Sequence, residues 1–324
     1  MTEQIPLAPP TLDDVRSAAR NIGGWLSLPT PLVYSPGLSE RLNAHVSLKL
    51  ETATPVSVFK VRGGLNLIGR MSAEQRTAGV ITASTGNHGQ SIAYAAKLFG
   101  ATAKVYMPLG ANPDKVASIE RLGGEVKLIG ERFDDARLQA EADSAAGNIR
   151  YVHPVDEPDL IAGVGAAALE VLEQQQPETD LVIVPLGGGT GAGGWITVRD
   201  GLNHGAQIWA AQSAQAPAAH DAWRSGEPAE RPNTTFAEGL ATAVPFLLPF
   251  EILRRSLDDF ILVDDKDIAS AVPLLIDLAH VLAEPAGAVS TAAACQERER
   301  LRGRRVVIVV SGANITRGQL RELI

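Results

Sequence analysis

The sequence predicts an α/β fold of two open-sheet lobes, each with helices on both faces of its sheet and with a ligand cleft between the lobes. The first observation is that short β-branched runs alternate with helical patterns from residue 79 onward. Such alternation is typical of parallel strands joined by crossover helices. The second is that a new set of strands and helices begins near Tyr151. The third is a glycine-rich loop, residues 187–194, that follows a buried strand, where open α/β sheets bind ligands.

The part of the chain before this alternation predicts fewer regular elements. Thr11 is a suitable N-cap for a helix that runs to about Arg20. The prolines of residues 29–32 favour an extended backbone. Residues 46–50 alternate as a strand does, and a polar link then leads to an apolar helical pattern at 65–71.

The two sets of elements divide the chain into two lobes. We expect residues 1–71 and 151–324 to form a large cofactor-binding lobe and residues 72–150 a small lobe that carries a substrate loop. The expected small-lobe strands are 80–83, 103–107 and 126–129, with helices at 92–98, 112–123 and from Asp134 onward. The expected large-lobe strands are 181–184, 208–211, 261–264 and 306–310, with helices at 159–175, 267–283 and 286–301.

Composition and charge are those of an ordinary globular protein. Of the 324 residues, 45% are hydrophobic and 20% are charged, which suits one large domain or two associated ones. The formal net charge of −8 argues against a nucleic-acid partner, because phosphate backbones require basic surfaces. The single cysteine, Cys295, excludes an intramolecular disulfide and suits a reducing compartment.

No targeting segment is expected. Residues 1–10 contain Glu3 and three prolines and lack the basic start and apolar run of a signal peptide. The longest apolar runs, such as 306–310, are strand-sized and too short to span a bilayer. We therefore expect a cytoplasmic protein with no membrane partner.

Lys60 lies in the segment Val58-Phe59-Lys60-Val61-Arg62-Gly63-Gly64, between a predicted strand and a predicted helix. A single lysine at such a junction is most often a solvated loop residue. It can instead be held in a cleft, where its amine forms a Schiff base with a carbonyl cofactor. The segment alone leaves both interpretations open.

The glycine-rich loop predicts a phosphate site. Glycines free the backbone N–H groups to converge on an anion, and the helix that follows adds a favourable dipole. Gly189, Gly191 and Gly194 also have the spacing of a dinucleotide-binding loop. However, the next strand ends at Gln212-Ser213 without the acidic residue that binds ribose, and no Lys-Ser/Thr pair follows the glycines. The phosphate is therefore expected to belong to a ligand other than a nucleotide.

Two further polar loops follow predicted strands. Residues 84–88, Ser-Thr-Gly-Asn-His, lead into a helix N-terminus, where amides and hydroxyls can hold a carboxylate. Ser84 or Thr85 can equally be an N-cap, and His88 suits a structural role as well as a catalytic one. Ser311 follows the last buried strand, as either a turn residue or a hydrogen-bonding group in the expected crevice.

Together these segments resemble the fold-type II pyridoxal-phosphate enzymes, and within them the serine/threonine dehydratase (ammonia-lyase) group. The resemblance extends from Thr30 to Asn314, with every motif in order. It implies a tryptophan synthase β-like fold, pyridoxal 5′-phosphate in the cleft between the lobes, and a homodimer.

The resemblance also implies a role for each site residue. Lys60 would carry the cofactor and act as the catalytic base, and Thr85 is the candidate acid/base on the opposite face. The implied substrate-binding residues are Ser84, Thr85, Gly86, Asn87 and His88. The implied cofactor-binding residues are Lys60, Phe59, Asn87, Gly187, Gly188, Gly189, Thr190, Gly191, Gly239, Glu284 and Ser311.

The implied reaction is the β-elimination of a small β-hydroxy amino acid, such as L-threonine or L-serine, to a 2-oxo acid and ammonia. A neutral serine at the pyridine nitrogen would not hold that nitrogen protonated, which favours elimination over transamination. The β-substituent stays open: threonine, serine, phenylserine, hydroxyaspartate and an ectoine-derived amino acid all fit.

Departures from the family pattern keep other functions in view. Thr85 replaces the serine that racemases of this group share, so an amino-acid racemase is the second choice. Val58 replaces a usual serine and Thr190 a frequent glycine, so both can reshape the phosphate end of the pocket. Lys60-Val61-Arg62 differs from the Lys-Asp-Arg of β-replacement synthases. A nucleotide-dependent oxidoreductase rests on the glycine spacing alone, and a cofactor-free binding protein would require Lys60 to be incidental.

Neither a metal nor a regulatory domain is expected. Family members with a divalent-metal site have acidic residues after the strand that ends here at Gln212, where this chain has Gln-Ser-Ala-Gln-Ala-Pro. Ten residues follow Asn314, too few for the C-terminal regulatory domain of the biosynthetic threonine enzymes.

Overall fold

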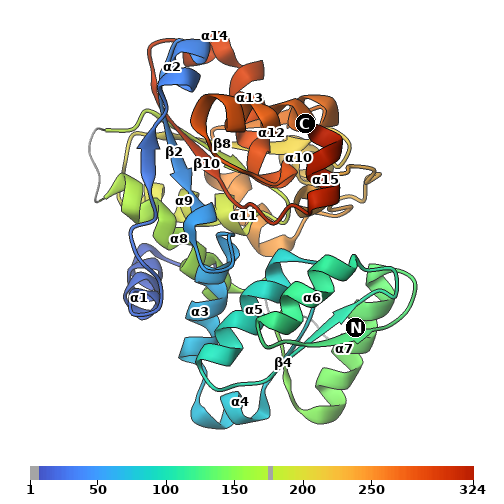
Figure 1. Ribbon diagram of the computed structural model, residues 1–324. Helices are drawn as coiled ribbons and strands as arrows, with labels where there is room; N and C mark the ends of the chain where they lie inside the picture. Colours follow the sequence, from blue (N-terminus) through green and yellow to red (C-terminus); the bar gives the residue numbers. More distant parts are fainter. Residues whose placement is uncertain (1–6, 174–177) are drawn as a thin grey trace.

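The computed structural model describes residues 7–173 and 178–324, and two β-sheets organise them (Figure 1). The strand order is β1-β2-β10-β7-β8-β9 in the larger sheet and β5-β4-β3-β6 in the smaller. The strands of the larger sheet are β1 (Leu32–Tyr34), β2 (His45–Leu50), β7 (Leu181–Pro185), β8 (Gln207–Ser213), β9 (Asp259–Val263) and β10 (Arg305–Val310). The strands of the smaller sheet are β3 (Val80–Ala83), β4 (Ala103–Met107), β5 (Glu125–Leu128) and β6 (Arg150–Tyr151).

Helices cover both sheets. Four of them belong to the smaller sheet: α4 (Ala73–Ala78), α5 (Asn87–Leu98), α6 (Pro113–Arg121) and α7 (Phe133–Gly147). The helices of the rest of the chain are α1 (Leu12–Ile22), α2 (Pro36–Leu42), α3 (Lys60–Arg70), α8 (Pro158–Leu172), α9 (Thr190–Gly201), α10 (Ala218–Ser225), α11 (Leu247–Ser256), α12 (Asp265–Ala279), α13 (Pro285–Gln296), α14 (Arg298–Leu301) and α15 (Arg317–Leu323). Short 3₁₀ turns occur at η1 (Glu51–Ala53) and η2 (Glu238–Leu240). Helix α3 packs on α5 of the small sheet and on α8, so it joins the two halves of the molecule.

The predicted fold class is confirmed, with local corrections. Strand β1 pairs antiparallel with β2, so the larger sheet is mixed rather than wholly parallel. The predicted helix 267–283 ends at Ala279, because His280 adopts a left-handed conformation with φ 56°. The predicted helix 286–301 is two helices, interrupted at Glu297.

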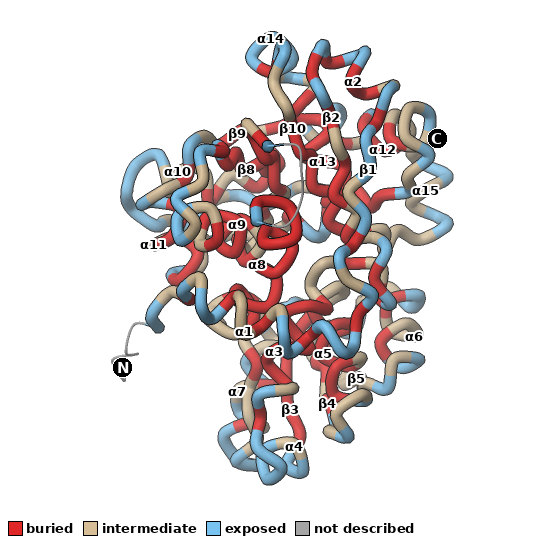
Figure 2. Tube along the Cα trace, turned by 90° about the vertical axis from the view of Figure 1, so that its left-hand side faces the viewer, coloured by how far each residue is buried: buried red, intermediate tan, exposed pale blue. Residues whose placement is uncertain are grey.

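Strand β10 lies inside the larger sheet and is buried on both faces. Val306, Ile308 and Val310 face one hydrophobic cluster, while Val307 and Val309 face another. Strands covered on both faces read as continuous apolar runs, which explains the Val-Val-Ile-Val-Val sequence. Figure 2 shows the buried strands at the centre and exposed positions on the outer helices.

A buried network of charged side chains fixes the start of α3, where Lys60 lies. The Arg62 guanidinium bonds Glu51 at 2.7 Å and Glu170 at 2.7 Å. Lys49 completes the network by donating from Nζ to Glu170 and, at 2.7 Å, to the carbonyl of Thr30. All four ionic side chains are at most 5% exposed. No local sequence pattern indicates this network, because its members are spread over 122 positions of the chain.

Within the ranges that the structure describes, no helix has both the length and the apolar character needed to cross a membrane.

Candidate active site

A cavity with a volume of about 210 Å³ lies between the two sheets. It brings together Lys60, the loop before α5, the loop before α9, and the start of the segment after β10. Every residue predicted for catalysis, cofactor binding or substrate binding lines it: Phe59, Lys60, Ser84, Thr85, Gly86, Asn87, His88, Gly187, Gly188, Gly189, Thr190, Gly191, Gly239, Glu284 and Ser311.

Lys60 is the first residue of α3. The preceding residue, Phe59, donates its N–H to the carbonyl of Ser311 at 2.9 Å, and Val58 forms a β-bridge with Gly312. These backbone contacts attach the lysine segment to the end of β10. Burial lowers the pKa of the Lys60 amine to about 8, although Glu284 opposes this shift. About a tenth of the amine is therefore unprotonated, and nucleophilic, at pH 7.

A chain of side-chain hydrogen bonds crosses the cavity. The amide of Asn87 donates from Nδ2 to Oε1 of Glu284 at 2.7 Å, and its Oδ1 accepts from Asn314 Nδ2 at 2.8 Å. The two contacts fix the orientation of the Asn87 amide. Burial raises the pKa of Glu284, and the Asn87 hydrogen bond works against that rise.

The loop before α5 presents backbone N–H groups to the cavity. Gly86 is the N-cap of α5, and no side chain caps it from that position, so neither Ser84 nor Thr85 is the N-cap. Ser84 nevertheless supports the helix end, because its hydroxyl accepts from Gly86 at 3.2 Å and from Gly89 at 2.9 Å. The first N–H groups of a helix have no helical acceptor, so this end suits a carboxylate.

His88 is buried beside β3 of the smaller sheet. Its Nε2 lies 3.0 Å from the hydroxyl of Thr82. Burial is the main cause that holds the pKa of His88 well below its ordinary value, and the charge of Lys60 adds to it. The imidazole is therefore neutral, which suits a structural or hydrogen-bonding role better than that of a cation.

The loop before α9 is shaped by its glycines. Gly189 is the N-cap of α9 and has a left-handed backbone with φ 98°. A methyl group at this position would also lie 2.7 Å from Cβ of Pro249. Phe59 packs against the next glycine of the loop, Gly191. The result is a close-fitting backbone cradle at a helix N-terminus, a geometry that binds phosphate.

Several cavity residues were not among the predicted site residues. The side chains of Phe133, Val155 and Phe246 form apolar parts of the cavity wall. The Phe246 ring packs edge-on against His153, with 5.6 Å between the ring centroids. Lys115 and Glu238 supply an ion pair. No local pattern in the sequence marks Lys115, which occupies an ordinary position in α6.

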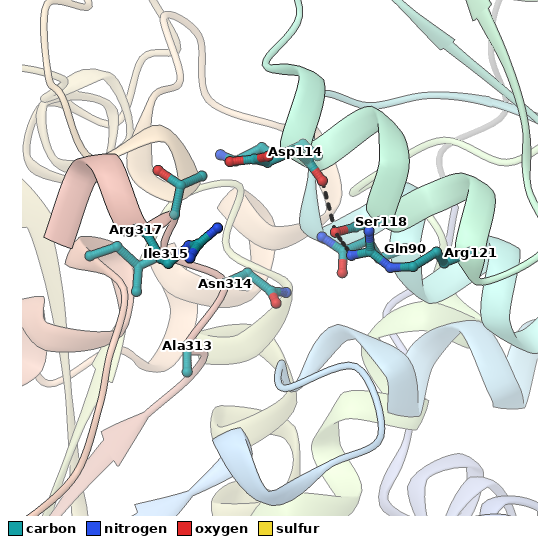
Figure 3. A pocket seen from close by; sticks show the side chains of 10 residues that line it. Gln90, Asp114, Ser118, Arg121, Ala313, Asn314, Ile315 and Arg317 are labelled. Atoms are coloured by element: carbon teal, nitrogen blue, oxygen red, sulfur yellow. Dashed lines mark hydrogen bonds between the residues drawn. The ribbon is translucent and has the colours of Figure 1, made fainter.

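A second cavity adjoins the first and shares Lys115 with it. It lies between α5 and α6 on one side and residues 313–317 on the other (Figure 3). Arg121 and Arg317 also line it. Arg121 is tied to its own helix, because its guanidinium donates to the Ser118 hydroxyl at 2.7 Å.

Comparisons with known proteins agree with this geometry. Residues 26–312 match the family described as pyridoxal-phosphate dependent enzyme. L-threonine ammonia-lyase from Thermotoga maritima is 36% identical over 307 residues, which are 94% of this chain and 76% of the relative. Serine racemase from Schizosaccharomyces pombe is 32% identical over 308 residues, 94% of each chain. The solved structure of processed threonine deaminase isoform 2 from Solanum lycopersicum superposes with a TM-score of 0.90 at 28% identity, covering 99% of this chain and 96% of that one.

The residues present fit the cofactor of that family. A partly buried lysine, a glycine cradle at a helix N-terminus and a buried serine after β10 line one cavity. These groups supply an amine for an aldehyde, N–H donors for a phosphate and a hydroxyl for a ring nitrogen. The chain belongs to the pyridoxal-phosphate dependent enzyme family, and pyridoxal phosphate is its cofactor.

Proposed function

We propose that the protein is a pyridoxal-phosphate dependent ammonia-lyase that converts L-threonine or L-serine to a 2-oxo acid and ammonia. The observation that carries the proposal is the convergence of Lys60, the glycine cradle and the loop before α5 on one cavity. The threonine ammonia-lyase and threonine deaminase likenesses support the same reaction.

The chain's own groups account for the binding steps. The N–H groups of residues 187–191 would hold the cofactor phosphate, and Ser311 would meet the pyridine nitrogen. The N–H groups at the start of α5 would hold the substrate carboxylate, beside Asn87. Pyridoxal phosphate, when bound, withdraws electrons from the α-carbon of an amino acid.

Lys60 is the proposed base. With its pKa near 8, the amine can accept the α-proton at neutral pH, close to the ideal for general base catalysis. Glu284 would keep its acceptor oxygen toward Asn87 and so hold the asparagine amide in one orientation. Because Ser311 is neutral, it would leave the ring nitrogen unprotonated, which limits build-up of negative charge on the α-carbon and favours loss of the β-hydroxyl.

A serine-type racemase is the second candidate. It is favoured by the likeness to serine racemase along 94% of both chains and by Thr85, which lines the cavity. Thr85 would supply or accept the proton on the face opposite Lys60.

One assay separates the two functions. The holoenzyme is incubated with L-threonine, L-serine and D-serine, and the 2-oxo acid, ammonia and both enantiomers are quantified. We expect equal amounts of oxo acid and ammonia with little enantiomer exchange. Lys60→Ala should abolish both products, whereas Lys127→Ala, at an exposed lysine of β5, should not change them. If the enantiomers interconvert and no oxo acid is released, the protein is a racemase and the proposed lyase function is wrong.

We also propose that the enzyme is a cytoplasmic homodimer of amino-acid catabolism. The family resemblance supports the dimer, and the single cysteine suits a reducing compartment. Light scattering should give twice the chain mass of 34.1 kDa; a monomer mass would contradict the dimer.

A further inference from the structure

An ion pair connects the two sides of the cavity. Lys115, from α6, and Glu238, from η2, pair through Nζ and Oε2. The Lys115 side chain is 11% exposed, whereas that of Glu238 is 45% exposed. Gln319 of α15 donates to the other Glu238 oxygen at 3.1 Å, so the carboxylate is held from two directions.

The ammonium of Lys115 lies beside the proposed substrate loop. A methyl group placed on Gly86 would be 4.0 Å from Lys115 Nζ. The walls of the same cavity also include apolar side chains from Phe133, Val155 and Phe246. A substrate side chain near Gly86 therefore meets one lysine whose charge Glu238 already compensates, in a cavity with partly apolar walls.

We propose that Glu238 sets the charge preference for the substrate side chain by neutralising Lys115. The inference rests on the proposed function, because it assumes that the loop before α5 holds the amino-acid carboxylate. The side-chain carboxylate of an acidic substrate would have to displace Glu238 from Lys115. It would then be repelled by the displaced carboxylate of Glu238, so acidic amino acids are disfavoured. A neutral side chain leaves the ion pair intact. Without the charge of Glu238, a largely buried ammonium lacks a counter-charge, and an acidic side chain supplies one.

Two amino acids without a β-hydroxyl test the inference by binding alone. L-aspartate and L-alanine differ in the side-chain carboxylate, and each is titrated into the holoenzyme while the absorbance of the bound cofactor is followed. Glu238→Gln should raise the affinity for aspartate relative to alanine by about tenfold or more, the scale of a hydrogen bond to a charged group. The double variant Lys115→Met/Glu238→Gln should lose this gain. Glu178→Gln, at a 75% exposed carboxylate, removes the same charge and should leave the ratio unchanged.

Two results would overturn the inference. The aspartate-to-alanine affinity ratio could stay the same in Glu238→Gln, even if both affinities change equally, as expected of a contact that only holds the two sides of the cavity together. Alternatively, the gain could persist in the double variant. Glu238→Ala, checked for folding by circular dichroism, repeats the test if the glutamine variant does not fold. The turnover of 3-hydroxyaspartate relative to threonine should rise in parallel in Glu238→Gln. If the wild-type enzyme releases no oxo acid from threonine or serine, the proposed function fails, while the binding ratio still decides the role of Glu238.

Discussion

At the scale of single residues, Lys60 combines burial with a role that needs a free amine. Burial lowers its pKa to about 8 from an ordinary 10.5. Only the unprotonated amine attacks an aldehyde, so capture of pyridoxal phosphate by the apoprotein should accelerate as pH rises and level off above about pH 8. Below that pH the rate should fall about tenfold per unit, as for any single titrating group. Stopped-flow absorbance measures the rate, and a rate that still rises tenfold between pH 9 and 10 would show an ordinary lysine.

Asn87 links two parts of the site, with Glu284 at 2.7 Å and Asn314 at 2.8 Å. Asn87→Asp keeps the shape but replaces a donor to Glu284 with a second carboxylate. A hydrogen bond to a charged group contributes about 1.5–3 kcal/mol, so kcat/KM should fall about 10–100-fold. Asn203→Asp, at an exposed turn, is the matched control and should retain activity. Equal activity in both variants would show that Asn87 has no role in the active site.

Residues marked by local patterns could be predicted, including Asn87 and Glu284, which meet across the cavity, whereas a residue marked only by its tertiary contacts could not. Lys60, Gly189 and Ser311 each follow a strand or precede a helix in a recognisable segment, and all three line the cavity. Lys115 meets Glu238 only because α6 and η2 face each other across 123 positions of sequence. In the sequence, Lys115 cannot be distinguished from a solvated lysine on a helix. Its burial comes from tertiary packing.

At the scale of elements, the turn into α9 combines a left-handed glycine with close packing. Gly189→Ala places a methyl group 2.7 Å from Pro249 at φ 98°, whereas Gly226→Ala has a similar φ of 80° and open space around it. Both substitutions cost about 1–2 kcal/mol in backbone strain. We expect Gly189→Ala to lose more stability than Gly226→Ala and also to weaken cofactor binding. Urea unfolding and cofactor titration measure the two effects, and equal losses with unchanged cofactor affinity would show that the turn is not a cradle.

The start of α3 depends on the buried network around Arg62. Arg62→Met leaves two buried carboxylates with Lys49 as their remaining cation, which should lower the unfolding free energy by about 3–5 kcal/mol. Arg137→Met breaks exposed pairs on α7 and should cost at most about 1 kcal/mol. Denaturant unfolding of both variants tests the difference. A loss below 1 kcal/mol for Arg62→Met would mean that the network does not hold α3.

Long, strongly patterned elements could be predicted, and short ones could not. The apolar runs of β7 and β10 and the capped start of α1 are visible in the sequence. Helices α2 and α15, each of seven residues, are too short for a periodic pattern, and packing decides their formation. For the same reason, the antiparallel pairing of β1 with β2 could not be read from a three-residue strand.

At the scale of the molecule, the chain forms two sheets, and the loops that follow their strands line one cavity. Contacts from both sides close around it: Asn87 meets Glu284, and Lys115 meets Glu238. The division into a large cofactor-binding lobe, 1–71 and 151–324, and a small lobe with the substrate loop, 72–150, stays a prediction. The alternation of strands and helices predicts the sheets, but only the fold brings their loops together.

Lys60 is the residue that we propose holds pyridoxal phosphate. Borohydride reduction of the holoenzyme, followed by proteolysis and mass spectrometry, locates the attached pyridoxyl group directly. We predict that it lies on the peptide that contains Lys60 and that Lys60→Ala carries none. Attachment to another lysine, or a wild-type protein that retains no pyridoxyl group after reduction, would contradict the account.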